Sequence, residues 1–204
     1  FVEQYKLLQY DLVNSGSWNP GAQDTFVREI KRTMIGKDAV VICDNRHGVM
    51  TEPIAKQIVQ EAKKHGIRSF VDSQISQSES NHEWYKGADF VFMNEFEADC
   101  VAEKFRRNPK ISQLGQISNF LKANIVYKRG ERGAVTVTTI GHETICSQGF
   151  TVDAVDTCGA GDAFMAAFVH HDRDLEAANR WAALSTTYKG TIVPKIEDLE
   201  RVRR

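Results

Sequence analysis

A glycine-rich segment in the C-terminal part of the chain, from Asp156 to Asp162, carries the residue types that phosphate chemistry needs. Gly159 and Gly161 allow a backbone to turn tightly and to approach a ligand closely. An apolar helical pattern begins beside them, so unpaired backbone N–H groups would point at the same spot, which suits an anion. Asp162 would lie in the first turn of that helix, where the helix dipole favours an ionised carboxylate. Such a carboxylate could accept the proton of a hydroxyl group that attacks a bound phosphoryl group.

The same segment also has a purely structural interpretation. Asp156 or Thr157 can cap the helix, and Phe164 can pack on Phe168 one helical turn later. The residues alone leave both interpretations open.

Two other glycine-rich nucleotide motifs are excluded. Phe164 stands where the dinucleotide fingerprint needs a small residue, and the chain has no G-x-x-x-x-G-K.

Polar residues also stand at the carboxyl ends of several expected strands. Apolar runs end at Asp44, at Asp72, at Asn94 and at Gly130. In an open α/β sheet, ligands bind outside the carboxyl ends of the strands. These four positions are therefore candidates for one common site, and an acidic residue after a strand is equally compatible with an ordinary polar loop.

The elements that must position these residues alternate between strands and helices. Repeated strand, helix, strand order predicts parallel strands joined by right-handed crossovers, and a glycine-containing turn between the last two strands predicts a hairpin. The expected fold is a mainly parallel sheet with an antiparallel edge, and polar loops are expected at 14–21 and 74–86. Strands are predicted at 37–44, 68–72, 88–93, 124–128, 134–138 and 141–146, and helices at 52–64, 95–105, 112–123, 160–170 and 175–188.

Composition and charge narrow the class of protein. The chain has 204 residues, 42% hydrophobic and 26% charged, and a formal net charge of -1, which predicts one globular domain over residues 1–204. A net charge this close to zero gives no excess of positive charge that would attract a nucleic acid or an anionic membrane. The longest apolar run, 163–169, is too short to span a bilayer, and the N-terminus has no secretory pattern. We therefore expect a cytoplasmic protein that acts on small molecules.

The segment from Asp156 to Asp162 fits D-T-x-G-A-G-D and resembles the second signature of the ribokinase-like, or PfkB, carbohydrate kinases. Two further motifs follow that family's order: residues 94–97 are similar to its N-x-x-E motif and residues 130–133 to its G-x-x-G nucleotide loop. Residues 43–51 and 71–72 most resemble heptose-7-phosphate kinases. The resemblance implies a ribokinase-like three-layer α/β/α sandwich. It also implies ATP-dependent transfer of the γ-phosphoryl group to an alcohol of a sugar or sugar phosphate.

The resemblance assigns catalytic roles to the glycine-rich segment. Asp162 corresponds to the family's catalytic base. Gly159, Ala160 and Gly161 correspond to the backbone anion hole for the transferred phosphate. Asp156 corresponds to a position that holds a monovalent cation such as K⁺ in some members.

The resemblance also implies a site for ATP and Mg²⁺. Asn94 and Glu97 correspond to residues that organise Mg²⁺ and the ATP phosphates through water, and they equally form a helix capping box. Asp44 and Asp72 are candidate substrate contacts. The positions similar to nucleotide-binding residues of the family are Lys128, Arg129, Gly130, Glu131, Arg132, Gly133, Thr157 and Asn179.

The chain departs from the heptose kinases in two places. His47 and Gln74 stand where those enzymes carry lysines that could hold a phosphate, and Arg46 and Lys128 add cations nearby. The acceptor is therefore open, and a nucleoside is one alternative.

The resemblance covers roughly the C-terminal two thirds of the family's length. The expected fold thus lacks the N-terminal part and the lid, which supply most sugar contacts in the family. A truncated or degenerate non-catalytic module, with an interaction or regulatory role, is the second expectation. The resemblance further implies a homodimer.

Overall fold

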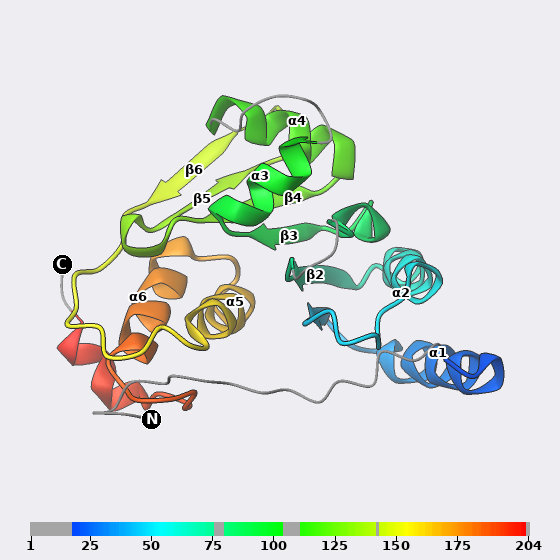
Figure 1. Cartoon of the computed structure of the whole chain (residues 1–204), viewed down its shortest axis with the longest axis horizontal. Helices are drawn as coiled ribbons and strands as arrows, with labels where there is room; N and C mark the ends of the chain where they lie inside the picture. Colours follow the sequence, from blue (N-terminus) through cyan, green and yellow to red (C-terminus); the bar gives the residue numbers. More distant parts are fainter. Residues whose placement is uncertain (1–17, 76–79, 104–110, 142, 203–204) are drawn as a thin grey trace.

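A six-stranded sheet, in the order β1-β2-β3-β4-β5-β6, runs through this computed structural model, which describes residues 18–75, 80–103, 111–141 and 143–202 (Figure 1). The first four strands are parallel, and the last two pair antiparallel with their neighbours. The predicted parallel sheet with an antiparallel edge is confirmed. The strands are β1 (Ala39–Asp44), β2 (Arg68–Ser73), β3 (Phe90–Met93), β4 (Asn124–Lys128), β5 (Ala134–Val137) and β6 (Thr144–Ser147).

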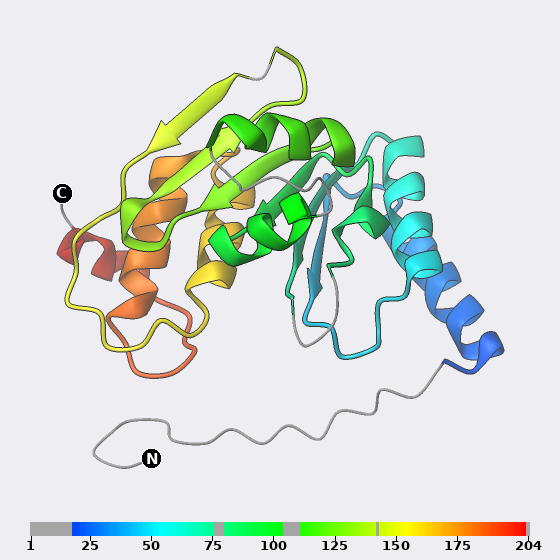
Figure 2. The same ribbon diagram turned by 45° about the horizontal axis from the view of Figure 1, so that its top comes forward.

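Helices cover both faces of the sheet and complete the three predicted layers (Figures 1 and 2). One face carries α1 (Pro20–Met34), α2 (Glu52–Lys64), α3 (Glu95–Glu103) and α4 (Ile111–Leu121). The other face carries α5 (Ala160–His170) and α6 (Leu175–Thr186). Short 3-10 turns are η1 (His82–Tyr85), η2 (Gly130–Arg132) and η3 (Ile196–Arg201).

Alternate side chains of the central strands enter the two cores. In β3, Val91 and Met93 join the core under α1 to α4, whereas Phe90 and Phe92 join the core under α5 and α6. A parallel sheet that is covered on both faces needs apolar residues at every position, and all four residues of β3 are buried. The ring of Phe168 lies edge-on to Phe92, with centroids 5.3 Å apart. This contact fixes α5 against the middle of the sheet.

The helix α1 was not expected, and part of it occupies the predicted loop 14–21, whose residues 14–17 lie outside the described part of the chain. Its sequence is polar and buries only a narrow apolar stripe, with Val27 and Met34 each 5% exposed. Asn19 provides the helix cap, because its Oδ1 accepts a hydrogen bond from the backbone N–H of Gly21 at 3.0 Å. Val27, Ile30 and Met34 recur at helical spacing, so the sequence carries the periodic signal of an amphipathic helix, which the sequence-based prediction did not use.

The predicted loop 74–86 is also different, because its second half is buried. Asn81 and Tyr85 surround the carboxylate of Asp44, which is 3% exposed. Asp44 Oδ2 accepts hydrogen bonds from the Tyr85 hydroxyl at 2.7 Å and from Asn81 Nδ2 at 2.7 Å. It also accepts one from Ser73 Oγ at 3.1 Å, and Oδ1 accepts the backbone N–H of Arg46 at 2.9 Å. The polar composition of this segment therefore reflects a buried hydrogen-bond network.

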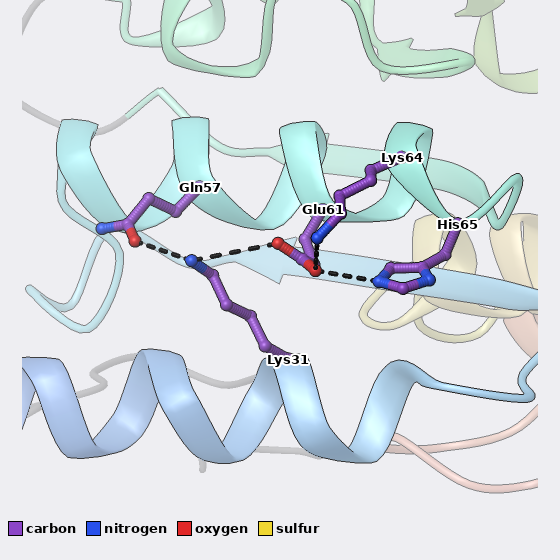
Figure 3. A network of polar contacts seen from close by, with 5 residues as sticks. All are labelled: Lys31, Gln57, Glu61, Lys64 and His65. Carbon is purple, nitrogen blue, oxygen red and sulfur yellow. Dashed lines mark hydrogen bonds and ion pairs between the residues drawn. The ribbon is translucent and has the colours of Figure 1, made fainter.

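A second polar network joins α1 to α2 (Figure 3). Lys31 Nζ donates a hydrogen bond to Gln57 Oε1 at 3.0 Å and lies 4.0 Å from Glu61 Oε2. Glu61 Oε1 lies 2.9 Å from His65 Nε2 and 3.4 Å from Lys64 Nζ. The hydrogen bond with His65 is the main cause that lowers the pKa of Glu61, and both lysines add to it.

Glu61→Gln should lower the thermal midpoint at neutral pH and have little effect in acid. A carboxyl whose pKa is lower in the folded chain than in the unfolded chain adds stability above its unfolded pKa, and this contribution is lost as the pH falls through the folded pKa. Thermal unfolding at about pH 7 and about pH 3 measures the difference. Glu29→Gln is the control, because Glu29 pairs only within α1, with Arg32. A deficit of the Glu61 variant that persists in acid would contradict the electrostatic origin.

Tyr85→Phe should lower the free energy of unfolding by about 1–3 kcal/mol, because it removes one donor from a buried carboxylate. Burial, and then the charge of Asp44, raise the pKa of Tyr85, so its hydroxyl stays protonated as a donor. Urea unfolding with linear extrapolation gives the value. The control is Tyr188→Phe, which removes a similar hydrogen bond to Asp198 in a more exposed place and should cost less. Equal losses in the two variants would show that burial of Asp44 does not matter.

Candidate active site

A cavity of about 340 Å³ opens at the carboxyl ends of the parallel strands and the start of α5. It lies where the strand-end argument predicts a ligand site. Of the residues singled out from the sequence, those that line it are Asp72, Gln74, Asn94, Glu97, Lys128, Gly159, Gly161 and Asp162.

The glycine turn delivers the start of α5 to this cavity. Gly159 is the N-cap residue of α5, has a φ of 82° and makes no side-chain cap bond, so the alternative in which Asp156 or Thr157 caps the helix is wrong. A Cβ at Gly159 would lie 3.0 Å from Thr191 Cγ2, so the turn needs glycine for both conformation and space. Asp162 is exposed in the first turn of the helix. The predicted contact of Phe164 with Phe168 is confirmed, with stacked rings 6.3 Å apart.

Ala160 differs from the two glycines beside it. Its backbone N–H donates to the carbonyl oxygen of Thr157 at 3.2 Å, whereas Gly159 and Gly161 line the cavity. The Thr157 side chain is exposed. The structure thus places Gly159 and Gly161 at the cavity and holds the Ala160 amide inside the turn.

Asp156 ties the turn to a second loop. Its Oδ1 accepts the backbone N–H of Cys158 at 2.9 Å, and its Oδ2 accepts the backbone N–H of Gly190 at 3.1 Å. These bonds connect two segments that are far apart in the sequence. The side chain therefore has a structural role in shaping the turn.

Asn94 and Glu97 form the predicted capping box at the start of α3. Asn94 Oδ1 accepts the backbone N–H of Glu97 at 2.9 Å, and Glu97 Oε2 accepts that of Asn94 at 2.7 Å. Glu97 is only 5% exposed, and this burial raises its pKa, while the bond from Asn94 and the charge of Lys128 act in the opposite direction.

The donor set of this cavity fits a metal ion that keeps much of its own water. Magnesium prefers oxygen ligands and is usually bound through one or two carboxylates together with substrate phosphates. Glu97 and Asn94 offer such oxygens at the cavity wall. In the described part of the chain, no group of three or more His, Cys, Asp or Glu side chains is placed to hold a metal directly.

The predicted nucleotide loop is a 3-10 turn that follows β4. The Arg129 backbone N–H donates to the Gly133 carbonyl at 2.8 Å and closes the loop. Arg132 pairs with Glu95 of α3 at 2.9 Å, and both side chains are largely exposed. Gly130 and Glu131 are exposed, and neither lines the cavity. Lys128 is the member of this loop region that lines the cavity.

The side chains of Asp72 and Asp44 lie on opposite faces of the sheet, because side chains alternate along each strand. Phe70 faces α5, so Asp72, two residues later, lies on the same side as the cavity. Ile42 faces the opposite core, and Asp44 follows it into the network with Tyr85. In the pairing of β1 with β2, Cys43 stands opposite Asp72. Cys43, which sequence reasoning missed, therefore lines the cavity in the place expected for Asp44.

Asn179 lies apart from the cavity lining and has a structural partner. It is 6% exposed, and its Nδ2 donates to the carbonyl oxygens of Ser147 at 3.3 Å and Gln148 at 3.2 Å. The amide joins α6 to the end of β6.

Asn45 and Phe96 line the cavity and were also not predicted from the sequence. Phe96 is 60% exposed, and its place inside N-x-x-E was the one available signal.

Gly133→Ala should destabilise the chain more than Gly130→Ala. A positive φ costs about 1–2 kcal/mol at Gly130 for a residue with a Cβ. Gly133, with φ 82° and ψ -142°, lies close to a region that is essentially restricted to glycine. At Gly133 the Cβ would also meet the carbonyl oxygen of Ser147, whereas nothing lies within 4 Å at Gly130. Urea unfolding of both variants measures the combined conformational and steric difference. Equal losses would mean that the contact between the nucleotide loop and the end of β6 is unimportant.

None of the helices in the described part of the chain has the length and apolar character of a membrane span.

A family model described as pfkB family carbohydrate kinase matches residues 37–198. Among curated proteins, deoxyribokinase of Salmonella typhi is 31% identical over 143 residues, which are 65% of this chain and 46% of that protein. Bifunctional protein HldE of Rhodopseudomonas palustris is 25% identical over 206 residues, 96% of this chain and 41% of that protein. The chain spans about half the length of these curated relatives.

Solved structures show the same fold. Phosphofructokinase-2 from Escherichia coli, in complex with potassium, has a TM-score of 0.71 at 21% identity and covers 91% of this chain and 62% of its own. Ribokinase from Thermotoga maritima has a TM-score of 0.66 at 24% identity and covers 84% of this chain and 58% of its own. The ribokinase-like architecture predicted from the motifs is thus confirmed. Because the family model matches most of its length, the chain belongs to the pfkB family of carbohydrate kinases.

Proposed function

We propose that this chain carries the phosphoryl-transfer centre of an ATP-dependent sugar kinase, with Asp162 as the general base. The observation that carries the proposal is the position of Asp162, exposed in the first turn of α5 and beside Gly159 and Gly161 in one cavity. An acceptor hydroxyl would attack the γ-phosphorus, the bond from phosphorus to the bridging oxygen of ADP would break, and Asp162 would take the hydroxyl proton. Phosphoryl transfer depends mainly on positioning and charge stabilisation, which the helix start supplies.

Asn94 and Glu97 would hold hydrated Mg²⁺ against the nucleotide phosphates, which fits their oxygens at the cavity wall. When bound, Mg²⁺ neutralises phosphate charge. Residues 129–133 and Thr157 would follow the nucleotide, as the family resemblance implies. A K⁺ ion at Asp156 stays a prediction, since both carboxylate oxygens there accept backbone N–H groups.

The proposed acceptor is an alcohol group of a sugar or a sugar phosphate. The resemblance of residues 43–51 and 71–72 to heptose-7-phosphate kinases supports a heptose-phosphate-type acceptor. The similarity to deoxyribokinase and to a ribose-1-phosphate kinase supports a pentose-type acceptor. A nucleoside acceptor, a homodimer and a cytoplasmic location stay predictions.

A non-catalytic module is the second candidate, because His47 and Gln74 stand where heptose kinases, by the resemblance, carry lysines that could hold a phosphate. The two candidates differ in turnover and agree in nucleotide binding. A panel of sugars, sugar phosphates and nucleosides, assayed for ADP release, separates them. Nucleotide binding without turnover on any acceptor would favour the non-catalytic module.

Asp162→Asn should reduce turnover by roughly 10²- to 10⁴-fold, the usual contribution of a general base. The amide keeps the shape of the carboxylate and cannot take the proton, so the affinity for MgATP should stay within about threefold. ADP release measures turnover, and titration calorimetry measures binding. Asp24→Asn, on the exposed face of α1, is the control and should leave both unchanged. Undiminished turnover of the Asp162 variant would exclude Asp162 as the base.

A further inference from the structure

Lys128 places an ammonium group at the floor of the cavity. It is the last residue of β4, which is held between β3 and β5. Its Nζ lies 2.5 Å from Asp72 Oδ2, and the two side chains are only 16% and 12% exposed. Among the described residues that line the cavity, Lys128 carries the sole positive charge, whereas Asp72, Glu97 and Asp162 carry carboxyl groups.

The ammonium lies directly beside the start of α5. A Cβ at Gly161 would be 3.5 Å from Lys128 Nζ, so the missing side chain of Gly161 leaves room for the lysine. The N-terminal end of a helix carries a partial positive charge, and a cation there is unfavourable unless an anion lies close by. Asp72 supplies one anion from the side of the sheet. The positive ends of the helix and of Lys128 therefore converge on one point of the cavity.

The charge of Lys128 also reaches other groups of the site. It lowers the pKa of Glu97, against the effect of burial, which raises it. It acts in the same direction on Cys43, where burial and the carboxylates of Asp162 and Asp72 raise the pKa. The ammonium is therefore close enough to Glu97 and Cys43 to act on both groups.

On the basis of the phosphotransfer proposed above, we propose that Lys128 donates hydrogen bonds to the non-bridging oxygens of the transferred phosphoryl group and that Asp72 positions it. The bond between the acceptor oxygen and phosphorus forms as the bond to the ADP oxygen breaks, the electron pair of the broken bond leaves with ADP, and the proton passes to Asp162. Lys128 stays protonated throughout. Its ammonium offsets the charge that a loose transition state spreads over the equatorial oxygens.

This proposal predicts selectivity for the terminal phosphate of the nucleotide. Lys128→Met should weaken the binding of the Mg²⁺ complex of the β,γ-imido analogue of ATP by about 10- to 100-fold, the size of a charge-assisted hydrogen bond. The affinity for MgADP, which lacks that group, should change by less than about threefold. Titration calorimetry on the whole chain measures both, and no acceptor is required. Lys128→Arg keeps the charge and should retain most of the selectivity.

Lys56→Met is the matched control. Lys56 forms an ion pair of the same length, 2.5 Å, with Glu52 on the exposed surface of α2. The variant loses the same charge away from the cavity, so neither nucleotide affinity should change. A loss of analogue affinity in this control would mean that overall charge, and not the position of Lys128, determines binding.

Asp72 is tested as a positioning residue. Asp72→Asn should reduce the preference for the imido analogue over MgADP, because the amide holds the ammonium less firmly, and Asp72→Glu should restore much of it. A merely structural role of Asp72 would change both affinities together and would gain nothing from the glutamate.

The outcomes separate this proposal from the proposed function. If the wild-type chain binds neither nucleotide, the proposed function fails, and the role of Lys128 fails with it. If the wild type binds both and Lys128→Met weakens both equally, or weakens neither, the role of Lys128 alone is overturned. Circular dichroism checks the fold of each variant. Should Lys128→Met fail to fold, Lys128→Gln, compared with Lys128→Arg, gives the same test.

Discussion

The position of α5 over the strand ends is the constraint on which the site depends. Phe168 and Phe164 of this helix lie edge-on to Phe92 of β3, at 5.3 and 6.2 Å between ring centroids. Each such aromatic pair contributes about 0.5–1.5 kcal/mol beyond the burial of its surface. Because β3 is buried on both faces, it cannot shift without disturbing both cores. The start of α5 is therefore fixed beside the ends of β2 and β4, and the glycine turn and Asp162 are fixed with it.

This placement brings several carboxyl groups together where a negatively charged polyphosphate would bind. Three carboxyl groups and one ammonium line the cavity, so a polyphosphate would enter a region with an excess of acidic groups. Backbone N–H groups at the helix start and the ammonium of Lys128 offset part of the repulsion. A divalent cation that arrived with the nucleotide would provide the remaining compensation, as in known phosphoryl-transfer sites.

The sequence predicted the elements whose signals are local and missed those that depend on tertiary partners. The strands and the helix after Gly159 have strong apolar patterns, and the family model agrees with the motif. The helix α1 is an exception, because its apolar residues recur at helical spacing and it was still not predicted. The buried residues Asn81 and His82 looked like loop residues, since polar side chains reveal their burial only when their hydrogen-bond partners are known.

The same difference between local signals and tertiary contacts applies to single residues of the candidate site. Strand ends predicted that Asp44 and Asp72 would lie together, but the direction of a side chain depends on register, and a shift of one residue reverses it. Cys43, and not Asp44, stands opposite Asp72. Lys128 follows Val126 by two residues, and Val126 faces α5, so the same period directs Lys128 toward the cavity. Asn179 was assigned by resemblance alone, and its amide instead joins α6 to β6.

The choice of acceptor is physically separate from the transfer chemistry. Gly159, Gly161 and Asp162 would contact only a phosphoryl group and one hydroxyl, which any sugar acceptor provides. These residues therefore do not determine which sugar is bound. The curated relatives bear the names of different sugar kinases. Discrimination must come from side chains that reach other parts of the sugar. Asn45 and Gln74, which line the cavity just after β1 and β2, are two described residues placed to contribute to it.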